Sequence, residues 1–253
     1  MKIIGKIKYV LLVPFVYKNF VKAFFSGLGL LNKNKECCWS LRNGLKICGT
    51  GSRWTWFILN EVFIKQEYAV SVSYPRTIID VGANIGAASL FFAKRFPNAT
   101  IYSFEPSKKN FNFLRKNIEL NSLQKRIIPV NAAVGKSNGK TNLYLNSDND
   151  GCHSLLREWN PKGKTVEVNV ISLDQFIKEK KIREIDLLKI DCEGTELEVL
   201  QSVKNFAKIK NIVLEAFSGT DENYVSKIIS FLEKKGFKIE KSKTPIIFAY
   251  SNI

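Results

Sequence analysis

One stretch near the middle of the chain limits what the protein can fold into. Residues 77–86 read Thr-Ile-Ile-Asp-Val-Gly-Ala-Asn-Ile-Gly, an apolar, β-branched run that ends in an acid and breaks into a turn with two glycines. Residues 87–96 then place apolar side chains on one helical face, so the pattern predicts a strand, a tight turn and a helix. A second β-rich run, 100–104, ends beside Glu105 and completes a βαβ unit. Asp80 and Glu105 should therefore meet at the carboxyl edge of a parallel sheet, where nucleotide-like ligands bind.

The glycines and acids of this βαβ unit suit a bound cofactor. Gly82 and Gly86 let the backbone adopt conformations that a Cβ obstructs, and they let a ligand approach closely. Glu105 can accept hydrogen bonds from both hydroxyls of a ribose, and Asp80 is placed to meet a cationic amino group. Asn84 stands where the dinucleotide fingerprint G-x-G-x-x-G has its second glycine, so that fingerprint is absent. We predict a cofactor site here; the alternative is an ordinary turn that opens a helix.

Three segments, in order, resemble the FkbM-type family of S-adenosylmethionine-dependent methyltransferases. They are residues 79–86 (Ile-Asp-Val-Gly-Ala-Asn-Ile-Gly), 104–106 (Phe-Glu-Pro) and 188–196 (Leu-Lys-Ile-Asp-Cys-Glu-Gly-Thr-Glu). The resemblance covers roughly residues 77–215. It implies S-adenosyl-L-methionine as the cofactor, a class I methyltransferase (Rossmann-like) α/β fold, and methyl transfer that usually goes to a hydroxyl oxygen. It does not imply which hydroxyl.

The order of the remaining elements favours the same fold. Their apolar patterns predict a sheet of seven mostly parallel strands with helices on both faces. A helix capped by Ser107 is expected over residues 107–121, followed by a third strand over 126–134. In this fold class the end of that strand usually contacts the adenine, which assigns Asn131 and Ala132 to the cofactor site. Further elements are expected as an antiparallel pair at 139–146 and 165–170, helices at 172–180, 195–203 and 221–235, and strands at 186–191, 211–215, 237–240 and 246–250.

Acidic residues follow the fourth expected parallel strand and are candidates for the chemistry. Asp191 and Glu193 should face the transferring methyl group, where a carboxylate can orient a hydroxyl and accept its proton. A divalent metal between paired acids is the alternative, although no metal ligand is assigned. His153, the single histidine, lies in a polar loop as a second candidate for the proton acceptor, and Glu215 ends the next strand. Glu196 is expected to favour a helix N-terminus instead.

The first 35 residues are basic and apolar together. They contain seven lysines and no acid, within a chain of 253 residues that has 39 basic and 23 acidic residues and a net charge of +16. Apolar residues repeat at helical spacing on both sides of Pro14, namely Ile3, Ile7, Val10 and Leu11 before it and Val21, Phe24, Phe25 and Leu28 after it. Lysines interrupt any run long enough to span a membrane. Residues 1–30 are therefore expected to cap the cofactor cleft or to lie on an anionic membrane surface; a signal anchor is the remaining alternative.

Length and composition favour one α/β domain with an extension. We divide the chain into a basic and aromatic N-terminal extension, residues 1–76, and an S-adenosylmethionine-binding domain, residues 77–253. Within the extension, residues 41–48 with Asn43-Gly44 predict a hairpin, and residues 59–66 a short helix. The aromatic residues of the extension are interpreted as core, with a sugar-binding surface as the alternative. They are Trp39, Trp54, Trp56 and Phe57.

Cysteine usage bears on the compartment. The five cysteines, Cys37, Cys38, Cys48, Cys152 and Cys192, form no C-x-x-C pair, and one histidine cannot complete a zinc site. We interpret them as reduced structural thiols of a cytoplasmic protein, which associates with membranes at most through residues 1–30.

Several functions compete. The leading hypothesis is an O-methyltransferase that acts on a hydroxyl of a saccharide, a glycolipid or a related small molecule. An NAD-dependent dehydrogenase is disfavoured by the missing G-x-G-x-x-G and by Asp80. The net charge suggests a nucleic-acid methyltransferase, but residues 191–194 read Asp-Cys-Glu-Gly where base-methylating enzymes commonly carry Asn/Asp-Pro-Pro-aromatic, and acids there repel phosphate. A nucleic-acid partner is therefore disfavoured. A non-catalytic, membrane-associated binding module is the last alternative, and failure to bind S-adenosylmethionine would favour it.

Overall fold

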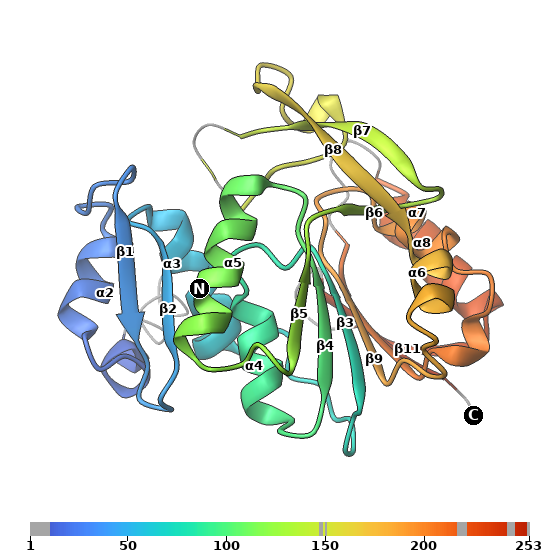
Figure 1. Cartoon of the computed structure of the whole chain (residues 1–253), viewed down its shortest axis with the longest axis horizontal. Helices are drawn as coiled ribbons and strands as arrows, with labels where there is room; N and C mark the ends of the chain where they lie inside the picture. The colour runs from blue at the N-terminus through green and yellow to red at the C-terminus, as the bar shows by residue number, and fades with distance from the viewer. Residues whose placement is uncertain (1–10, 147–148, 150, 217–221, 242–245, 252–253) are drawn as a thin grey trace.

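The computed structural model describes residues 11–146, 149, 151–216, 222–241 and 246–251 (Figure 1). Its strands are β1 (Glu36–Ser40), β2 (Lys46–Thr50), β3 (Thr77–Val81), β4 (Thr100–Phe104), β5 (Ile127–Val130), β6 (Ala133–Gly135), β7 (Gly139–Tyr144), β8 (Thr165–Ser172), β9 (Leu187–Ile190), β10 (Asn211–Glu215), β11 (Phe237–Lys241) and β12 (Ile246–Ser251). Its α-helices are α2 (Phe20–Gly27), α3 (Arg53–Asn60), α4 (Ala87–Arg95), α5 (Lys108–Leu120), α6 (Leu173–Glu179), α7 (Glu196–Gln201) and α8 (Tyr224–Lys234). Residues 11–16 are also helical, Glu61–Lys65 form a π-helical turn, and Arg157–Trp159 and Phe206–Lys208 form 3₁₀ turns.

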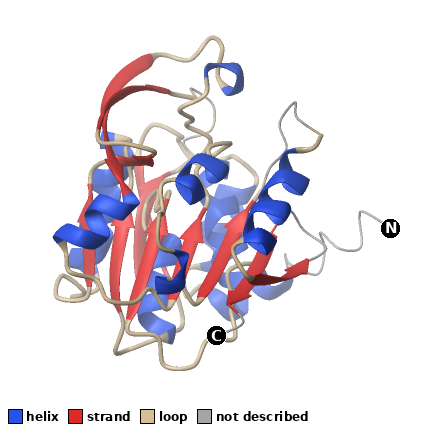
Figure 2. Cartoon of the chain, turned by 90° about the vertical axis from the view of Figure 1, so that its right-hand side faces the viewer, coloured by secondary structure: helices blue, strands red, loops and turns tan. Residues whose placement is uncertain are grey.

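Within the described residues the large sheet has seven strands in the order β11-β12-β10-β9-β3-β4-β5 (Figures 1 and 2). β12 pairs antiparallel with β10 and β11, whereas β10, β9, β3, β4 and β5 run parallel. The predicted class I methyltransferase fold is therefore confirmed. The chain leaves the central β3 toward β4 on one side and returns to β9 on the other. That reversal is the switch point at which open α/β sheets bind their ligands.

Hydrophobic clusters cover both faces of this sheet. Successive residues of β3 point to opposite faces, so Ile78 joins the cluster beneath α4 and α5, and Ile79 joins the cluster beneath α6, α7 and α8. Figure 1 shows these two helical layers on opposite sides of the sheet. By the same alternation Asp80 shares the face of Ile78 and points toward α4, which decides its role at the site.

The third expected strand, residues 126–134, is shorter than predicted. β5 ends at Val130, the Ala132 N–H donates back to the Val130 carbonyl at 3.0 Å, and β6 begins at Ala133. The predicted antiparallel pair is confirmed as β7 and β8, and β6 joins it to form a three-stranded sheet in the order β6-β8-β7. Figure 2 shows this small sheet rising above one end of the large one. The β7–β8 loop brings His153 to the carboxyl edge of the large sheet.

The hairpin predicted over residues 41–48 is confirmed, and its strands extend farther. β1 and β2 pair antiparallel around a turn in which Gly44 has a φ of +96° and Asn43 Oδ1 accepts the Leu45 N–H at 3.1 Å. Asn117 of α5 fixes the hairpin to the body of the protein. Its side chain accepts the Cys48 N–H at 2.7 Å and donates to the Cys48 carbonyl at 2.8 Å.

The register of the hairpin sets Cys38 directly opposite Cys48, and the two cysteines form a disulfide. This corrects the expectation that all five cysteines are reduced thiols. Cys37, Cys152 and Cys192 are free. The cytoplasmic location depended partly on reduced thiols and stays a prediction.

The helix expected over residues 59–66 begins earlier. α3 starts at Arg53, where Ser52 Oγ accepts the Trp54 N–H at 3.1 Å, and it continues into the π-helical turn Glu61–Lys65. The turn ends at Gln66, whose φ of +54° stops the helix. Turns of this type are frequent at functional sites.

The extension shares its hydrophobic core with the sheet. Tyr17, Trp39 and Ile47 belong to the same buried cluster as Ile78 and Leu90. The division at residue 77 therefore stays a proposal about chain organisation. In the described part of the chain, no helix has the length and apolar character needed to cross a membrane. The first ten residues of the predicted basic, apolar segment lie outside the described residues, and so does Asp221, the expected start of the last helix. Ile3, Ile7 and Val10 are among those ten.

Candidate active site

A cavity of about 440 Å³ lies at the carboxyl edge of β3, β4, β9 and β10, a size that suits a small-molecule site. Its walls also include α3 and the β7–β8 loop. Seven of the ten residues predicted for the site line the cavity: Gly82, Asn84, Glu105, Ala132, His153, Asp191 and Glu193. The other three, Asp80, Gly86 and Asn131, act behind its wall.

The turn after β3 depends on its two glycines. Gly82 has a φ of +76°, and a Cβ there would overlap the carbonyl oxygen of Asp191. Gly86 has a φ of +91°, and a Cβ there would lie 2.7 Å from Cδ1 of Leu114 on α5. The backbone reason predicted for both glycines is confirmed. Gly86 serves the close packing of α4 on α5, whereas Gly82 borders the cavity itself.

Glu105 is fixed by backbone donors from both sides. Its Oε2 accepts the Asn84 N–H and its Oε1 accepts the Ser107 N–H, each at 2.8 Å. Burial raises the pKa of Glu105 to about 7, while these two hydrogen bonds oppose the rise. The residue is only 5% exposed and borders the cavity. Because a carboxylate offers about four acceptor positions, Glu105 keeps places for hydroxyls of a ligand.

Asn131 and Ala132 separate into two roles. The Asn131 side chain donates to the carbonyls of Glu105 at 2.9 Å and Pro106 at 3.1 Å, so it braces the loop after β4 and does not line the cavity. Its assignment as a direct cofactor contact is revised accordingly. Ala132 and Ala133 do line the cavity, and their methyl groups leave room for a flat ring.

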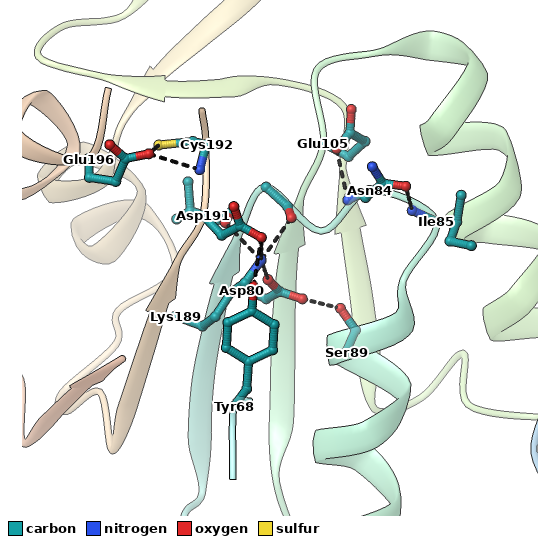
Figure 3. Close-up of polar contacts among 12 residues, drawn as sticks. Tyr68, Asp80, Asn84, Ile85, Ser89, Glu105, Lys189, Asp191, Cys192 and Glu196 are labelled. Carbon is teal, nitrogen blue, oxygen red and sulfur yellow. Dashed lines mark hydrogen bonds and ion pairs between the residues drawn. The ribbon is translucent and has the colours of Figure 1, made fainter. Parts of the chain in front are cut away.

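Asp80 does not line the cavity. Figure 3 shows its side chain between those of Lys189 and Ser89. It pairs across the sheet with Ser103 and with Lys189, so the three side chains share one face. Lys189 Nζ lies 3.0 Å from Asp80 Oδ1, and Ser89 Oγ of α4 donates to Asp80 Oδ2 at 2.6 Å. The carboxylate has no exposed surface. The predicted contact between Asp80 and a cationic amino group is therefore revised, because Lys189 already supplies its counter-charge.

Lys189 connects this buried carboxylate to the cavity. Its Nζ donates to the Gly82 carbonyl at 2.9 Å, lies 3.5 Å from Asp191 Oδ2, and sits 5.2 Å from the centre of the Tyr68 ring. Burial alone lowers the pKa of Lys189, but the carboxylates of Asp80 and Asp191 raise it above its ordinary value. The ammonium group therefore stays charged and holds the glycine turn against β9.

Asp191 follows β9 and reaches the cavity with a side chain that is 27% exposed. The Tyr68 hydroxyl donates to its Oδ2 at 2.8 Å. Burial raises the pKa of Tyr68, and the charge of Asp191 raises it further, so the phenol remains a donor. Asp191 is thus held in one orientation by a hydroxyl and by Lys189.

Four further acidic residues, Glu61, Glu193, Glu196 and Glu215, also line the cavity. Burial raises the pKa of Glu193, and the charges of Asp191 and Glu196 raise it further. Burial also raises the pKa of Glu215, with Asp191 and Glu61 adding to the effect. Carboxylates shifted in this direction are suited to proton transfer near neutral pH.

The backbone around Glu193 is shaped for this position. Glu193 has a φ of +57°, a conformation that is uncommon outside glycine and is found at functional sites. Ser154 Oγ donates to the Glu193 carbonyl at 2.7 Å and ties the β7–β8 loop to it. Glu196 stabilises the loop between β9 and α7, because its carboxylate accepts the N–H groups of Gly194 at 2.9 Å and Cys192 at 3.3 Å. This supports a structural role for Glu196.

His153 is less suited to accept a proton. Its Nδ1 accepts the Asn146 N–H at 3.1 Å, which places the lone pair on Nδ1 and assigns the proton of the neutral ring to Nε2. The acceptor nitrogen of the ring is therefore already engaged by the backbone.

The aromatic residues of the extension divide between core and cavity. Trp39 is fully buried in the core, as predicted. Trp54 and Phe57 line the cavity, together with Trp159 from the β7–β8 loop. For Trp54 and Phe57 the alternative interpretation, a surface that meets a ligand, fits their positions better.

Comparison with known proteins now identifies the family. A family model described as the methyltransferase FkbM domain matches residues 80–239, more than half of the chain. The chain belongs to the FkbM methyltransferase family. It is therefore an S-adenosylmethionine-dependent methyltransferase, as the resemblance of its three motifs implied.

Relatives of this FkbM-type chain differ in what they methylate. It is 25% identical over 239 residues to the 31-O-demethyl-FK506 methyltransferase FkbM of Streptomyces tacrolimicus, covering 81% of this chain and 90% of that protein. It is 28% identical over 153 residues to the hexuronic acid methyltransferase AglP of Haloferax volcanii, covering 60% of each. A solved structure of methyltransferase FkbM from Methylobacillus flagellatus KT has a TM-score of 0.51 at 14% identity, covering 72% of this chain and 45% of that one. This last likeness shows the shared fold.

The cavity of this FkbM-type methyltransferase fits its cofactor. Glu105 would accept hydrogen bonds from ribose hydroxyls, and Ala132 and Ala133 would border the adenine. When bound, S-adenosylmethionine supplies an electrophilic methyl group to this edge of the sheet.

Sequence reasoning missed several residues of the site. Lys189 had a visible signal, because a lysine inside the apolar run 187–190 needs a buried counter-charge. Tyr68 and Glu61 had none, since they come from the irregular extension and reach the cavity only through tertiary packing.

Metal donor atoms are not gathered around Asp191. Among the described residues, the one trio of potential ligand atoms closer than 4.8 Å is Glu36, Cys38 and Cys48, and its two cysteines are disulfide-bonded. In the part of the chain that the structure describes, Asp191 and Glu193 belong to no such trio. Treatment with a chelator tests whether a metal takes part in turnover.

Proposed function

We propose that this methyltransferase transfers its methyl group to a hydroxyl oxygen of a saccharide, a glycolipid or a related small molecule. The observation that carries the proposal is the set of carboxylates Asp191, Glu193 and Glu215, which face the cavity from strands on the other side of β3 from Glu105. A hydroxyl is a poor nucleophile, and it gains from a positioned acceptor for its proton.

Glu193 is the proton acceptor in this proposal. Its raised pKa makes it a stronger base than an exposed glutamate, and it stays within the range where ionisation at neutral pH is accessible. The hydroxyl oxygen would bond to the methyl carbon as the bond from that carbon to the sulfonium sulfur breaks, and the cofactor would leave as a neutral thioether. The hydroxyl proton would pass to a carboxylate oxygen of Glu193. Such assistance typically contributes about 10²–10⁴-fold to the rate.

Asp191 orients the hydroxyl group of the acceptor in this proposal. Tyr68 and Lys189 hold its carboxylate in place, so a hydroxyl that donates to the free side of that carboxylate meets a fixed partner. A fixed partner saves reorganisation when the methyl group transfers. Lys189 itself acts as a positioning residue, through Asp191 and the Gly82 carbonyl.

The wall of the cavity supports a sugar-like acceptor. Trp54, Phe57 and Trp159 offer aromatic faces beside the carboxylates, and the C–H faces of a sugar ring pack on such surfaces while its hydroxyls reach acceptors. Two relatives, a hexuronic acid methyltransferase and a 31-O-demethyl-FK506 methyltransferase, also favour a sugar or another small molecule as the acceptor. A nucleic-acid acceptor is disfavoured because its phosphates would have to approach a cavity lined by six acidic side chains.

The test supplies the purified protein with S-adenosylmethionine labelled in its methyl group and with glycan, lipid and RNA fractions. We expect label in the glycan or glycolipid fraction, in a form that resists alkali, because a methyl ether survives conditions that hydrolyse a methyl ester. Extracts of cells with and without the active protein should also differ by one methylene increment in the same molecule.

Glu119→Gln, on the exposed face of α5, is the matched control for Glu193→Gln in both experiments. The control should label acceptors as the wild type does. Label that appears only in RNA, or that alkali releases completely, would contradict the proposal.

A further inference from the structure

Large apolar side chains gather on the surface of residues 11–30. In the described part of the chain, eight of the eleven exposed ones lie in this segment. They are Leu11, Phe15, Phe20, Val21, Phe24, Phe25, Leu28 and Leu30, here called the N-terminal apolar surface. Single exposed apolar residues are ordinary, but a continuous group marks a surface that meets a partner. Figure 1 draws α2 at the margin of the molecule, away from the large sheet.

Helix α2 turns its large side chains outward and its small ones inward. Ala23 and Ser26 are fully buried, and a Cβ on Gly27 would lie 2.9 Å from the Trp56 indole of α3. Phe24 and Phe25 lie on the outward side, each more than two-fifths exposed. A helix that packs on its own domain normally buries the large residues. The outward face of α2 therefore has a use other than folding this chain.

The segment is fixed to the body of the protein. Val13 and Tyr17 are buried in the main core, and the Tyr17 hydroxyl donates to Asn60 Oδ1 at 3.0 Å. Asn19 Oδ1 accepts the Ser40 N–H at 3.0 Å from β1. These contacts hold the N-terminal apolar surface in a defined orientation.

The charge of the segment identifies the partner. Residues 1–35 carry seven lysines and no acid, and Lys18 and Lys22 lie within the apolar segment itself. A second copy of the chain would bring the same positive charge against it, which disfavours self-association through this face. Exposed aromatic and aliphatic residues combined with lysines fit the boundary between phosphate headgroups and acyl chains.

The remaining alternatives fit less well. α2 has eight residues, too few to span a bilayer. None of residues 11–30 lines the cavity, so the segment does not cap it directly. We propose that residues 11–30 dock the protein on an anionic membrane surface, with the N-terminal apolar surface at the acyl boundary and the lysines at the phosphates. This inference does not depend on which acceptor is methylated.

Vesicle flotation of the full chain tests the proposal. Vesicles of phosphatidylcholine alone are compared with vesicles of equal parts phosphatidylcholine and phosphatidylglycerol. The wild type should float with the anionic vesicles only. Raising the salt from about 0.1 M to about 1 M shortens the Debye length from about 10 Å to about 3 Å and should weaken the binding.

Two sets of substitutions separate the apolar and charged contributions. Phe15→Ser with Phe24→Ser and Leu28→Ser should lower the partition coefficient more than about a hundredfold, because each apolar side chain that enters the membrane accounts for about tenfold or more. The matched control replaces the exposed Tyr74, Leu120 and Val166 by serine and should bind as the wild type does. Each variant is first shown to keep the wild-type circular dichroism and thermal midpoint.

Lys18→Glu with Lys22→Glu should lower binding to anionic vesicles by about tenfold or more, since each lysine near the surface contributes about 1 kcal/mol, or about fivefold. Lys125→Glu with Lys136→Glu makes the same change of net charge elsewhere on the surface and should have less than about half that effect on a logarithmic scale. No flotation of the wild type, or equal flotation of the triple serine variant, would overturn the proposal. So would a dimer in sedimentation that only the triple serine variant loses, because the surface would then meet a second copy.

Discussion

Replacing Lys189 by methionine removes the cation between Asp80 and Asp191 while it keeps most of the side-chain volume. Lys189 is 2% exposed, and the Asp80 carboxylate that it neutralises at 3.0 Å is fully buried. The substitution therefore leaves a charged group inside the protein with one remaining neutral donor, the Ser89 hydroxyl. It also removes the donor of the Gly82 carbonyl.

The expected loss is about 3–5 kcal/mol in the free energy of unfolding, the range for removing one partner of a buried ion pair. That is a large share of the about 5–15 kcal/mol that stabilises a typical domain. Most of the loss should come from the stranded carboxylate, because methionine fills the space of the lysine stem. Adding Asp80→Asn removes that charge, so Lys189→Met with Asp80→Asn should recover at least half of the loss.

Urea unfolding followed by circular dichroism measures these differences. Lys178→Met is the matched control, because Lys178 lies 3.5 Å from Asp174 with a side chain that is 73% exposed. Its loss should stay below about 0.5 kcal/mol, as for other exposed pairs one helical turn apart. A loss below about 1 kcal/mol in Lys189→Met, or a double variant no more stable than the single one, would refute the account of the buried network.

Three further outcomes are expected. Glu105→Ala should weaken S-adenosylmethionine binding by about ten- to a hundredfold, or about 1.5–3 kcal/mol, and calorimetry showing unchanged affinity would refute the ribose assignment. Asp191→Asn and Glu193→Gln should leave the affinity for S-adenosylmethionine within a few-fold, while turnover falls by about 10²–10⁴-fold. A chelator that abolishes the turnover of the wild type would favour the metal alternative. Near-normal turnover in both variants would point to Glu215 or His153 as the proton acceptor. The stability of the free protein should fall as the pH rises from about 5 to about 8, because the pKa of Glu105 is raised by burial to about 7 and those of Glu193 and Glu215 are raised by burial and neighbouring acids. A carboxyl group with a raised pKa in the folded protein contributes its full stability below its unfolded pKa of about 4.3, and this contribution is lost as the pH rises through its folded pKa. Denaturation curves measured over a series of pH values should therefore show a smaller loss of stability in Glu215→Gln. Glu119→Gln, the control, should show the same loss as the wild type.

The fold was predictable because its parallel strands are short, apolar and separated by helices with clear periodicity. β4 and β10 match their expected bounds, because an acid marks the carboxyl end of each strand and the spacing of apolar residues changes there. The third strand was overestimated because residues 132–134 are apolar although β5 ends at Val130, and composition alone does not reveal that β6 pairs in another sheet. The disulfide depends on the exact register of the hairpin. A two-residue turn at Asn43-Gly44 would set Cys38 opposite Gly49, whereas the connection formed by residues 42–44 shifts the register by one residue and sets Cys38 opposite Cys48.

The site was predictable wherever one residue follows directly from a strand end. Glu105, Asp191 and Glu193 fall into this class, and all three border the cavity. Asp80 was harder to place, because its role depends on sheet register and not on its distance from the glycine turn. Side chains alternate between the two faces along a strand, so an aspartate one position closer to the carboxyl edge would have pointed to the opposite face of the sheet.

The net charge of the chain and the charge of its cavity have opposite signs, and together they constrain the acceptor. The excess of lysine is densest in residues 1–35, whereas six acidic residues line the cavity: Glu61, Glu105, Asp191, Glu193, Glu196 and Glu215. Acids that raise one another's pKa destabilise the free protein, and such groups are retained where a site needs them. A phosphate or another anionic group of the acceptor would add to this repulsion. We therefore expect the reacting hydroxyl to belong to a neutral or cationic part of its molecule, with any anionic group held outside the cavity against the basic surface.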